Sequence, residues 1–147
     1  MQAADLERLT RGLDEATLSR RPAAGQWSLK ELLSHLWAVQ LLFMERTEKM
    51  LCEDRPSFAS YHPEEDANPH LMEVRPAAEI LEDFLEERGR FLDTLEHLEP
   101  ADWNRAAQHP DFGNYDIHFL AEYLLYYEAQ HLFQVVRQRG AAKLSPA

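Results

Sequence analysis

Apolar side chains recur every three or four residues over most of this chain, and this spacing is the feature that most restricts its fold. The spacing is typical of helices that bury one face, and no segment sustains the alternation that indicates a strand. The pattern predicts four helices at about residues 2–14, 29–52, 76–99 and 115–139, with a short helical turn at residues 14–18. We therefore expect an all-α four-helix bundle without a sheet.

Local signals mark the ends of these helices. Ser28 followed by Glu31 forms a capping box, in which the serine oxygen accepts a backbone N–H of the first helical turn. Pro76 is favoured at a first helical position, and Gly140 is expected to end the last helix. Residues 54–75 contain three prolines among polar residues, which predicts a long crossover connection between the second and third helices. Long loops of this kind often cover functional sites.

Size and charge restrict the class of protein. A chain of 147 residues with 45% hydrophobic positions has the balance of one domain spanning residues 1–147. The net charge of −11 argues against nucleic acid or an anionic membrane as a partner. Cys52 is the single cysteine, so the chain can form neither an internal disulfide nor a cysteine-rich zinc site. No targeting segment or membrane span is apparent, and we expect a cytoplasmic protein.

Two histidines lie on faces that otherwise resemble bundle core. His35 shares a face of the second helix with Leu32 and Val39, and Tyr127 and His131 lie one turn apart on an inward face of the last helix. Facing helices could therefore bring His35, Tyr127 and His131 together. A buried imidazole needs a hydrogen-bond partner or a metal ion, and the spacing leaves both alternatives open.

Four stretches of the chain follow one another in a recognisable order and spacing. They are Arg21-Pro22 with Gly25-Gln26-Trp27-Ser28, then His35 eight residues after the tryptophan, then Asp102-Trp103 with His109-Pro110-Asp111-Phe112-Gly113, and finally Tyr127-Glu128 with His131 and Gln134. In this combination the chain resembles the DinB/YfiT-like superfamily of four-helix-bundle metalloenzymes over almost its whole length. The resemblance implies the same bundle fold and an internal metal site.

The resemblance also implies a set of ligands. In this family, one histidine of the second helix and two histidines of the last helix, spaced i and i+4, commonly bind a divalent metal. Position by position, the first falls on His35 and the last on His131, whereas the middle position holds Tyr127. A neutral phenol is a poor donor, and ionising Tyr127 as a ligand would require the charge of the metal to lower its pKa. We expect His35, His131 and Tyr127 to form the metal site.

Other residues near these motifs are assigned smaller roles. Glu128 lies about 100° round the helix from Tyr127, which predicts a position behind the ligands or facing solvent. The crossover residues His62 and His70 are alternative donors, although loop histidines are usually solvated. The charged run at residues 86–90 is interpreted as a solvated helix face, and His109 is expected to anchor its loop.

Two hypotheses of function follow from the resemblance. The first is a metal-dependent enzyme, using zinc, nickel, iron or manganese, that acts as a thiol-dependent transferase or isomerase on a small-molecule substrate, with a low-molecular-weight thiol as partner. The alternative is a metal-free bundle that serves as a small-molecule-binding or interaction module, and Tyr127 favours it. A homodimer formed through outer helix faces is expected in either case.

Overall fold

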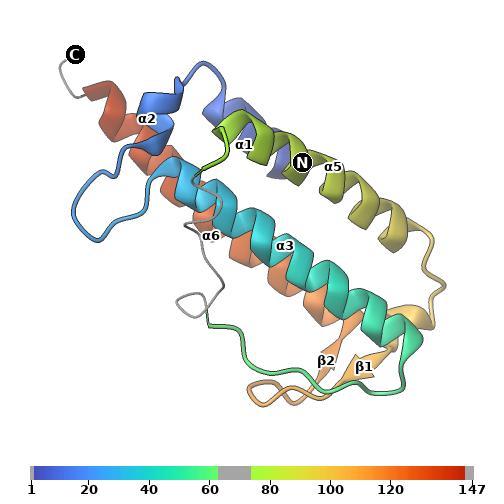
Figure 1. The fold of residues 1–147 in the computed structure, drawn as a ribbon. Coiled ribbons are helices and arrows are strands. Elements are labelled where there is room, and N and C mark those ends of the chain that lie inside the picture. The colour runs from blue at the N-terminus through green and yellow to red at the C-terminus, as the bar shows by residue number, and fades with distance from the viewer. Residues whose placement is uncertain (1, 63–73, 145–147) are drawn as a thin grey trace.

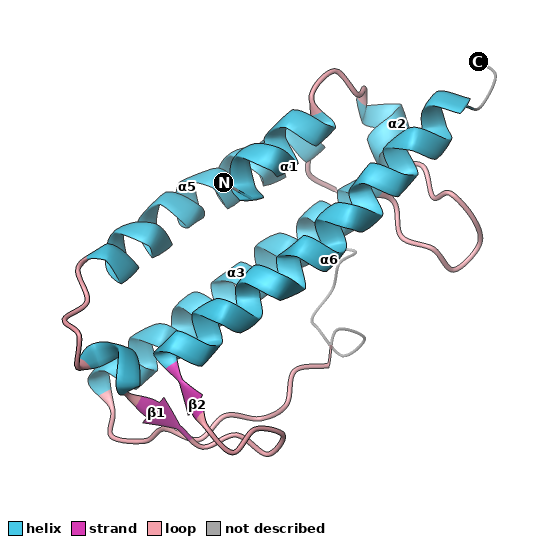
Figure 2. Cartoon of the chain, turned by 180° about the vertical axis from the view of Figure 1, so that it is seen from behind, coloured by secondary structure: helices cyan, strands magenta, loops and turns pink. Residues whose placement is uncertain are grey.

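The all-α bundle predicted from the sequence is confirmed by the structure, a computed structural model that describes residues 2–62 and 74–144 (Figure 1). Its α-helices are α1 (Gln2–Thr10), α2 (Glu15–Ser19), α3 (Leu29–Cys52), α5 (Ala77–Glu96) and α6 (Ile117–Leu144). In the bundle, α3 packs against α5 and α6, and α1 packs against the same two helices. Figure 2 shows α3 and α6 running side by side along the length of the molecule. Residues that face each other across these two helices can therefore form an internal site.

Two apolar clusters fill the bundle, one toward each end. The first includes Leu6, Leu32 and Phe84, and the second includes Phe43 and Leu120. Along α3 the first cluster extends to Leu36 and the second begins at Val39, so the clusters meet near the middle of the helix. Burial of these side chains drives folding, and the polar side chains described below lie close to the junction between the clusters.

The ends of the helices agree with the sequence prediction in part. As predicted, Ser28 caps α3, and its Oγ accepts the backbone N–H of Glu31 at 3.1 Å. The predicted stop at Gly140 is wrong, because α6 continues through this residue to Leu144. A glycine inside a helix costs about 1 kcal/mol relative to alanine, which does not by itself end a long helix that is packed in a bundle.

The structure also corrects the expectation that the chain contains no sheet. Strands β1 (Ala106–Ala107) and β2 (Tyr115–Asp116) pair antiparallel, with Ala106 opposite Asp116 and Ala107 opposite Tyr115. Strands of two residues are too short to show an alternating pattern in the sequence. Their pairing closes the loop that leads into α6. A 3-10 helix, η2 (Asp102–Asn104), lies just before β1 in the chain.

The described start of the crossover lies against this small sheet (Figure 2). The backbone N–H of Phe58 donates to the carbonyl of Gln108 at 2.9 Å, and the N–H of Gln108 donates to the carbonyl of Pro56 at 2.8 Å. Arg46 of α3 donates to the carbonyl of Ala59 at 2.7 Å and to the hydroxyl of Tyr115 at 3.0 Å. The crossover is thereby attached to α3 before it reaches the candidate site.

His109 lies in the loop between the two strands and anchors it, as predicted. Its ring stacks on that of Tyr115 with centroids 4.8 Å apart, and its Nδ1 accepts the backbone N–H of Asp111 at 3.1 Å. Burial, with a smaller contribution from the charge of Arg46, lowers the pKa of His109 below its usual value. Protonation therefore costs more in the folded protein than in the unfolded chain.

We expect this shift to be visible in solution. Because the pKa of His109 is lower in the folded state, its contribution to the free energy of unfolding falls as the pH drops through the ordinary histidine pKa of about 6.5. An NMR titration should give His109 a lower pKa than His97, an exposed residue whose pKa is raised by its hydrogen bond to the carbonyl of Asp93. Equal pKa values for the two rings would show that His109 is not buried as described.

Candidate functional site

The structure brings together the three side chains singled out in the sequence. His35 projects from α3, and Tyr127 and His131 project from α6. The Nε2 atom of His35 lies 2.6 Å from the hydroxyl oxygen of Tyr127, and a hydrogen bond joins them. The centroid of the His131 ring lies 5.0 Å from that of His35 and 4.8 Å from that of Tyr127. Two imidazoles and one phenol therefore converge between the two helices.

The position of His35 follows from the way α3 begins. Because the cap at Ser28 sets the first turn, His35 comes about two turns into the helix at 3.6 residues per turn. The carboxylate of Glu31 accepts hydrogen bonds from the guanidinium of Arg21 at 2.7 and 3.1 Å, which attaches the preceding loop to this turn. Trp27, the residue before the cap, packs edge-on against the His35 ring with centroids 4.9 Å apart. Trp27 thus forms a wall of the site.

Gln134 orients His131. Its side-chain Oε1 lies 3.3 Å from Nδ1 of His131, and a carboxamide oxygen can only accept a hydrogen bond. Nδ1 therefore carries the proton, and Nε2 keeps its lone pair. Burial lowers the pKa of His131, and the hydrogen bond to Gln134 opposes part of this effect. The neutral imidazole is thereby favoured, which is the form that binds metals and accepts protons.

Tyr61 is a member of the site that sequence analysis missed. It comes from the crossover, and its ring stacks over His35 with centroids 6.3 Å apart. Tyr61 lies outside the helices, so helical spacing could not place it beside the other site residues. Only the expectation that long loops cover functional sites pointed to the crossover. The neighbouring His62 is exposed and lines a different hollow together with Arg46. His70 lies outside the described residues.

Two expectations of solvent exposure for charged residues are corrected. Glu128 does not face solvent, because it is only 3% exposed and forms an ion pair with Arg88 of α5. Arg88 belongs to the run that was interpreted as a solvated face, yet its Nε donates to Oε1 of Gln40 at 2.6 Å. Gln40 in turn donates to the carbonyl of Phe84 at 3.0 Å. These side chains form a buried network, and only Arg88 points inward from an otherwise charged stretch of sequence.

The donor atoms at the site can be tested against a metal. Among the described residues, no group of three histidine, cysteine, aspartate or glutamate side chains is placed to hold an ion. The convergent donors are instead Nε2 of His35, the hydroxyl oxygen of Tyr127 and the imidazole of His131. Two neutral imidazoles with one ionised phenol supply three protein ligands, the number typical of catalytic zinc sites. The residues present therefore fit a divalent ion if Tyr127 binds as phenolate.

Helical bundles often hold a binding or catalytic site in their core, built from side chains on facing helices. The inward histidines of α3 and α6 place this chain in that class. The comparison with protein families is consistent with this class, because the family model described as the DinB superfamily matches residues 1–135. The chain belongs to the DinB superfamily.

A solved structure shares the fold. It is YfiT from Bacillus subtilis, described as a probable metal-dependent hydrolase with an unusual four-helix bundle topology. The TM-score is 0.82 at 18% sequence identity, and the match covers 98% of this chain and 83% of YfiT. A comparison with curated proteins gives no significant match. Within the described residues, no helix has the length and apolar character needed to cross a membrane.

Proposed function

We propose that this protein is a metal-dependent enzyme that binds one divalent ion through His35, His131 and Tyr127. The observation that carries the proposal is the convergence of these donors from α3 and α6, with the two histidine rings 5.0 Å apart. Membership of the DinB superfamily and the description of YfiT as a probable metal-dependent hydrolase support it. Zinc, nickel, iron and manganese are the candidate ions, and imidazole ligands suit zinc, nickel and iron best among them.

Neighbouring residues set the protonation and the orientation of the proposed histidine ligands. Gln134 holds the proton on Nδ1 of His131, as the partners of metal-binding histidines commonly do. Trp27 and Tyr61 pack against the ring of His35 and restrict its orientation. A bound divalent ion with an open position would supply a Lewis acid that lowers the pKa of a water or thiol. This chemistry suits hydrolysis as well as the thiol-dependent transfer or isomerisation that we propose, with a low-molecular-weight thiol as the partner.

Metal content tests the proposal directly. Protein purified without a polyhistidine tag would be incubated with zinc, nickel, manganese or ferrous iron and examined by elemental analysis. We expect close to one ion per chain, lost in both His35→Ala and His131→Ala. His118→Ala is the matched control, because His118 is an exposed histidine near the start of the same helix α6. Absence of metal under every condition, or its retention in both site variants, would overturn the proposal.

A second candidate function has one observation in its favour. The hydrogen bond between His35 and Tyr127 satisfies the buried imidazole without any ion. A metal-free bundle that binds a small molecule or a protein partner would have this arrangement in its resting state. In that case the wild type and the three variants of the metal experiment would contain equally little metal.

The homodimer stays a prediction that concerns the outer face of α6. Large apolar side chains are exposed there, including Leu125, Tyr126, Phe133 and Val136. These positions lie within about 100° of one another round the helix, so they form one stripe. We propose that a second copy of the chain covers this stripe, in line with the apolar character of homodimer interfaces.

A further inference from the structure

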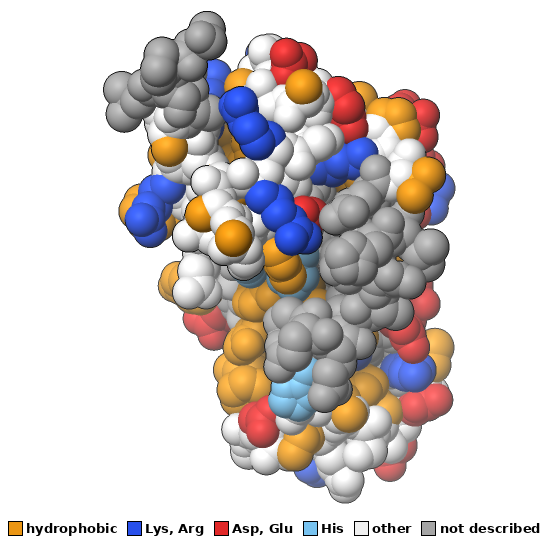
Figure 3. All heavy atoms as spheres, turned by 60° about the vertical axis from the view of Figure 1, so that its left-hand side comes forward, with side chains coloured by type: hydrophobic (Ala, Val, Ile, Leu, Met, Phe, Trp, Pro, Cys, Tyr) orange, Lys and Arg blue, Asp and Glu red, His pale blue; other side chains and the backbone are white. Residues whose placement is uncertain are grey.

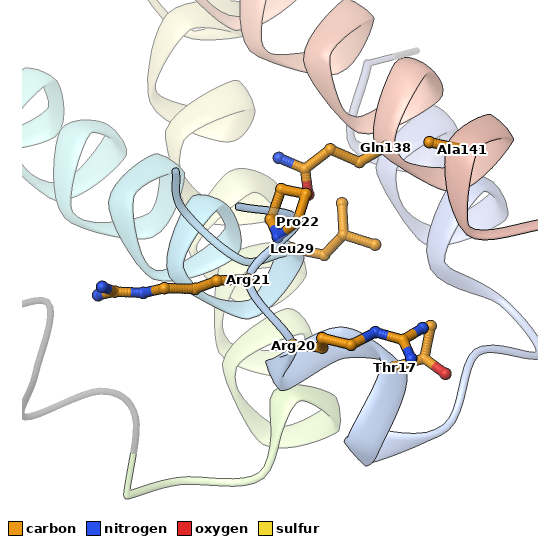
Figure 4. A pocket seen from close by; sticks show the side chains of 7 residues that line it. All are labelled: Thr17, Arg20, Arg21, Pro22, Leu29, Gln138 and Ala141. Carbon is orange, nitrogen blue, oxygen red and sulfur yellow. The ribbon is translucent and has the colours of Figure 1, made fainter. Parts of the chain in front are cut away.

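The last part of this acidic chain carries only basic charges. The chain carries 26 acidic and 15 basic residues, yet residues 129–147 contain three basic residues and no acidic residue. Arg20 follows α2, and the loop after it lies against the same part of α6, as Figure 4 shows for Pro22 beside Gln138. In Figure 3, Lys and Arg side chains gather around the upper part of one face, above a histidine and hydrophobic side chains. A negatively charged group would be attracted to the basic side chains along this part of α6.

A hollow of about 560 Å³ opens between this loop and α6. Its volume falls within the range of small-molecule sites, roughly 300–1,000 Å³. Four glutamines and one arginine contribute to its lining, with Gln26 on the loop and Gln130, Gln134 and Arg137 on α6, and no carboxylate is among the lining residues. Carboxamide and guanidinium N–H groups are hydrogen-bond donors, and a guanidinium matches a carboxylate in a bidentate pair.

Arg137 is the charged residue among those that line this hollow. It is exposed, and no described carboxylate forms an ion pair with it, unlike Arg21, which is neutralised by Glu31. Gln134 lies one turn before Arg137 on the same helix and lines the same hollow. Because its Oε1 is directed to His131, its NH₂ group remains as a donor. Gln134 thus connects the hollow to the candidate metal site.

We propose that the hollow binds the carboxylate group of a small-molecule substrate, with Arg137 as its charged partner and Gln26 and Gln134 as amide donors. A ligand held in this way extends past Gln134 toward His131. The identity of the ligand as a substrate rests on the proposed function, whereas carboxylate binding at Arg137 requires no metal. The two ideas can therefore be tested separately.

An NMR titration with succinate tests the proposal. The ¹⁵N-labelled protein, examined as purified and again after treatment with EDTA, would be titrated with sodium succinate and with neutral succinamide at constant ionic strength. We expect saturable shifts of the Gln26, Gln130 and Gln134 amide signals with succinate only. Arg137→Gln should weaken binding by about tenfold or more, because a charge-assisted hydrogen bond is lost. Arg90→Gln, a change at an exposed arginine of α5, should bind as the wild type does.

Several results would overturn the proposal. They are equal binding of succinate by Arg137→Gln and wild type, equal binding of succinamide and succinate, and shifts that never saturate. A second variant, Gln26→Glu, places a negative charge in the hollow and should also weaken succinate binding. Failure of the metal proposal would appear in elemental analysis and would leave the titration of EDTA-treated protein unchanged. Failure of the carboxylate proposal would appear in the titration and leave the metal content unchanged.

Discussion

Replacing Arg88 by alanine is expected to lower the free energy of unfolding by about 3–5 kcal/mol, the usual cost of breaking a buried ion pair by removing one partner. Glu128 would be left in the interior at 3% exposure without its cation. Burial already raises the pKa of Glu128, and the charge of Arg88 opposes this rise. Gln40 would also lose the donor that reaches its Oε1 at 2.6 Å. The variant therefore leaves two buried acceptors without a partner.

Urea denaturation followed by circular dichroism measures this loss. Arg90→Ala is the matched control, because Arg90 lies two residues away on α5 with its side chain 61% exposed. A change at such a surface position is expected to stay within about 0.5 kcal/mol. The double variant Arg88→Met with Glu128→Leu should recover most of the lost stability, since it removes both charges together. A loss below about 1 kcal/mol in Arg88→Ala would mean that the network is hydrated and not buried as described.

Replacing Tyr127 by histidine is expected to raise the affinity for a divalent ion by at least about tenfold, because changing even an outer partner of a metal ligand alters affinity by 10–100-fold. A neutral imidazole binds a metal without first losing a proton, whereas the phenol of Tyr127 must ionise. The new ring would start from a position already near the rings of His35 and His131, with the present Tyr127 ring 5.9 and 4.8 Å from them. Three histidines would then converge, as the family pattern has them.

Competition with a coloured chelator would measure the affinity of this variant for zinc. The control is Tyr126→His, which adds a histidine to the same helix at a position that is 68% exposed. Unchanged affinity in Tyr127→His, or an equal gain in the control, would contradict the role assigned to position 127.

Much of the candidate site could be predicted because it lies on helices. Spacing of three and four residues places His35 between Leu32 and Val39 on an inward face, and Tyr127 and His131 one turn apart on another. The structure then brings these faces together across α3 and α6. The bound metal stays a proposal, because Tyr127 stands where the resemblance implies a third histidine and so changes the donor set.

The parts that could not be predicted depend on contacts between distant segments. Tyr61 reaches His35 from the crossover, and the register of β1 and β2 follows from the way their loop closes. Arg88 lies in a charged run and Glu128 lies between Tyr127 and Ala129, and neither stretch of sequence identifies the distant partner that burial of its charge requires. Their pairing is visible only once α5 and α6 are packed together.

The sequence by itself determined the helices, the cap at the start of α3 and the faces that the helices bury, because these properties arise from residues within a few positions of one another. Only the tertiary structure decided which charged side chains enter the core and which aromatic residues surround His35. The physical reason is that a buried charge is stable only with its partner in place, and here the partners Arg88 and Glu128 lie 40 positions apart on different helices. The same holds for the hollow at Arg137, which exists only because the loop after α2 lies against α6.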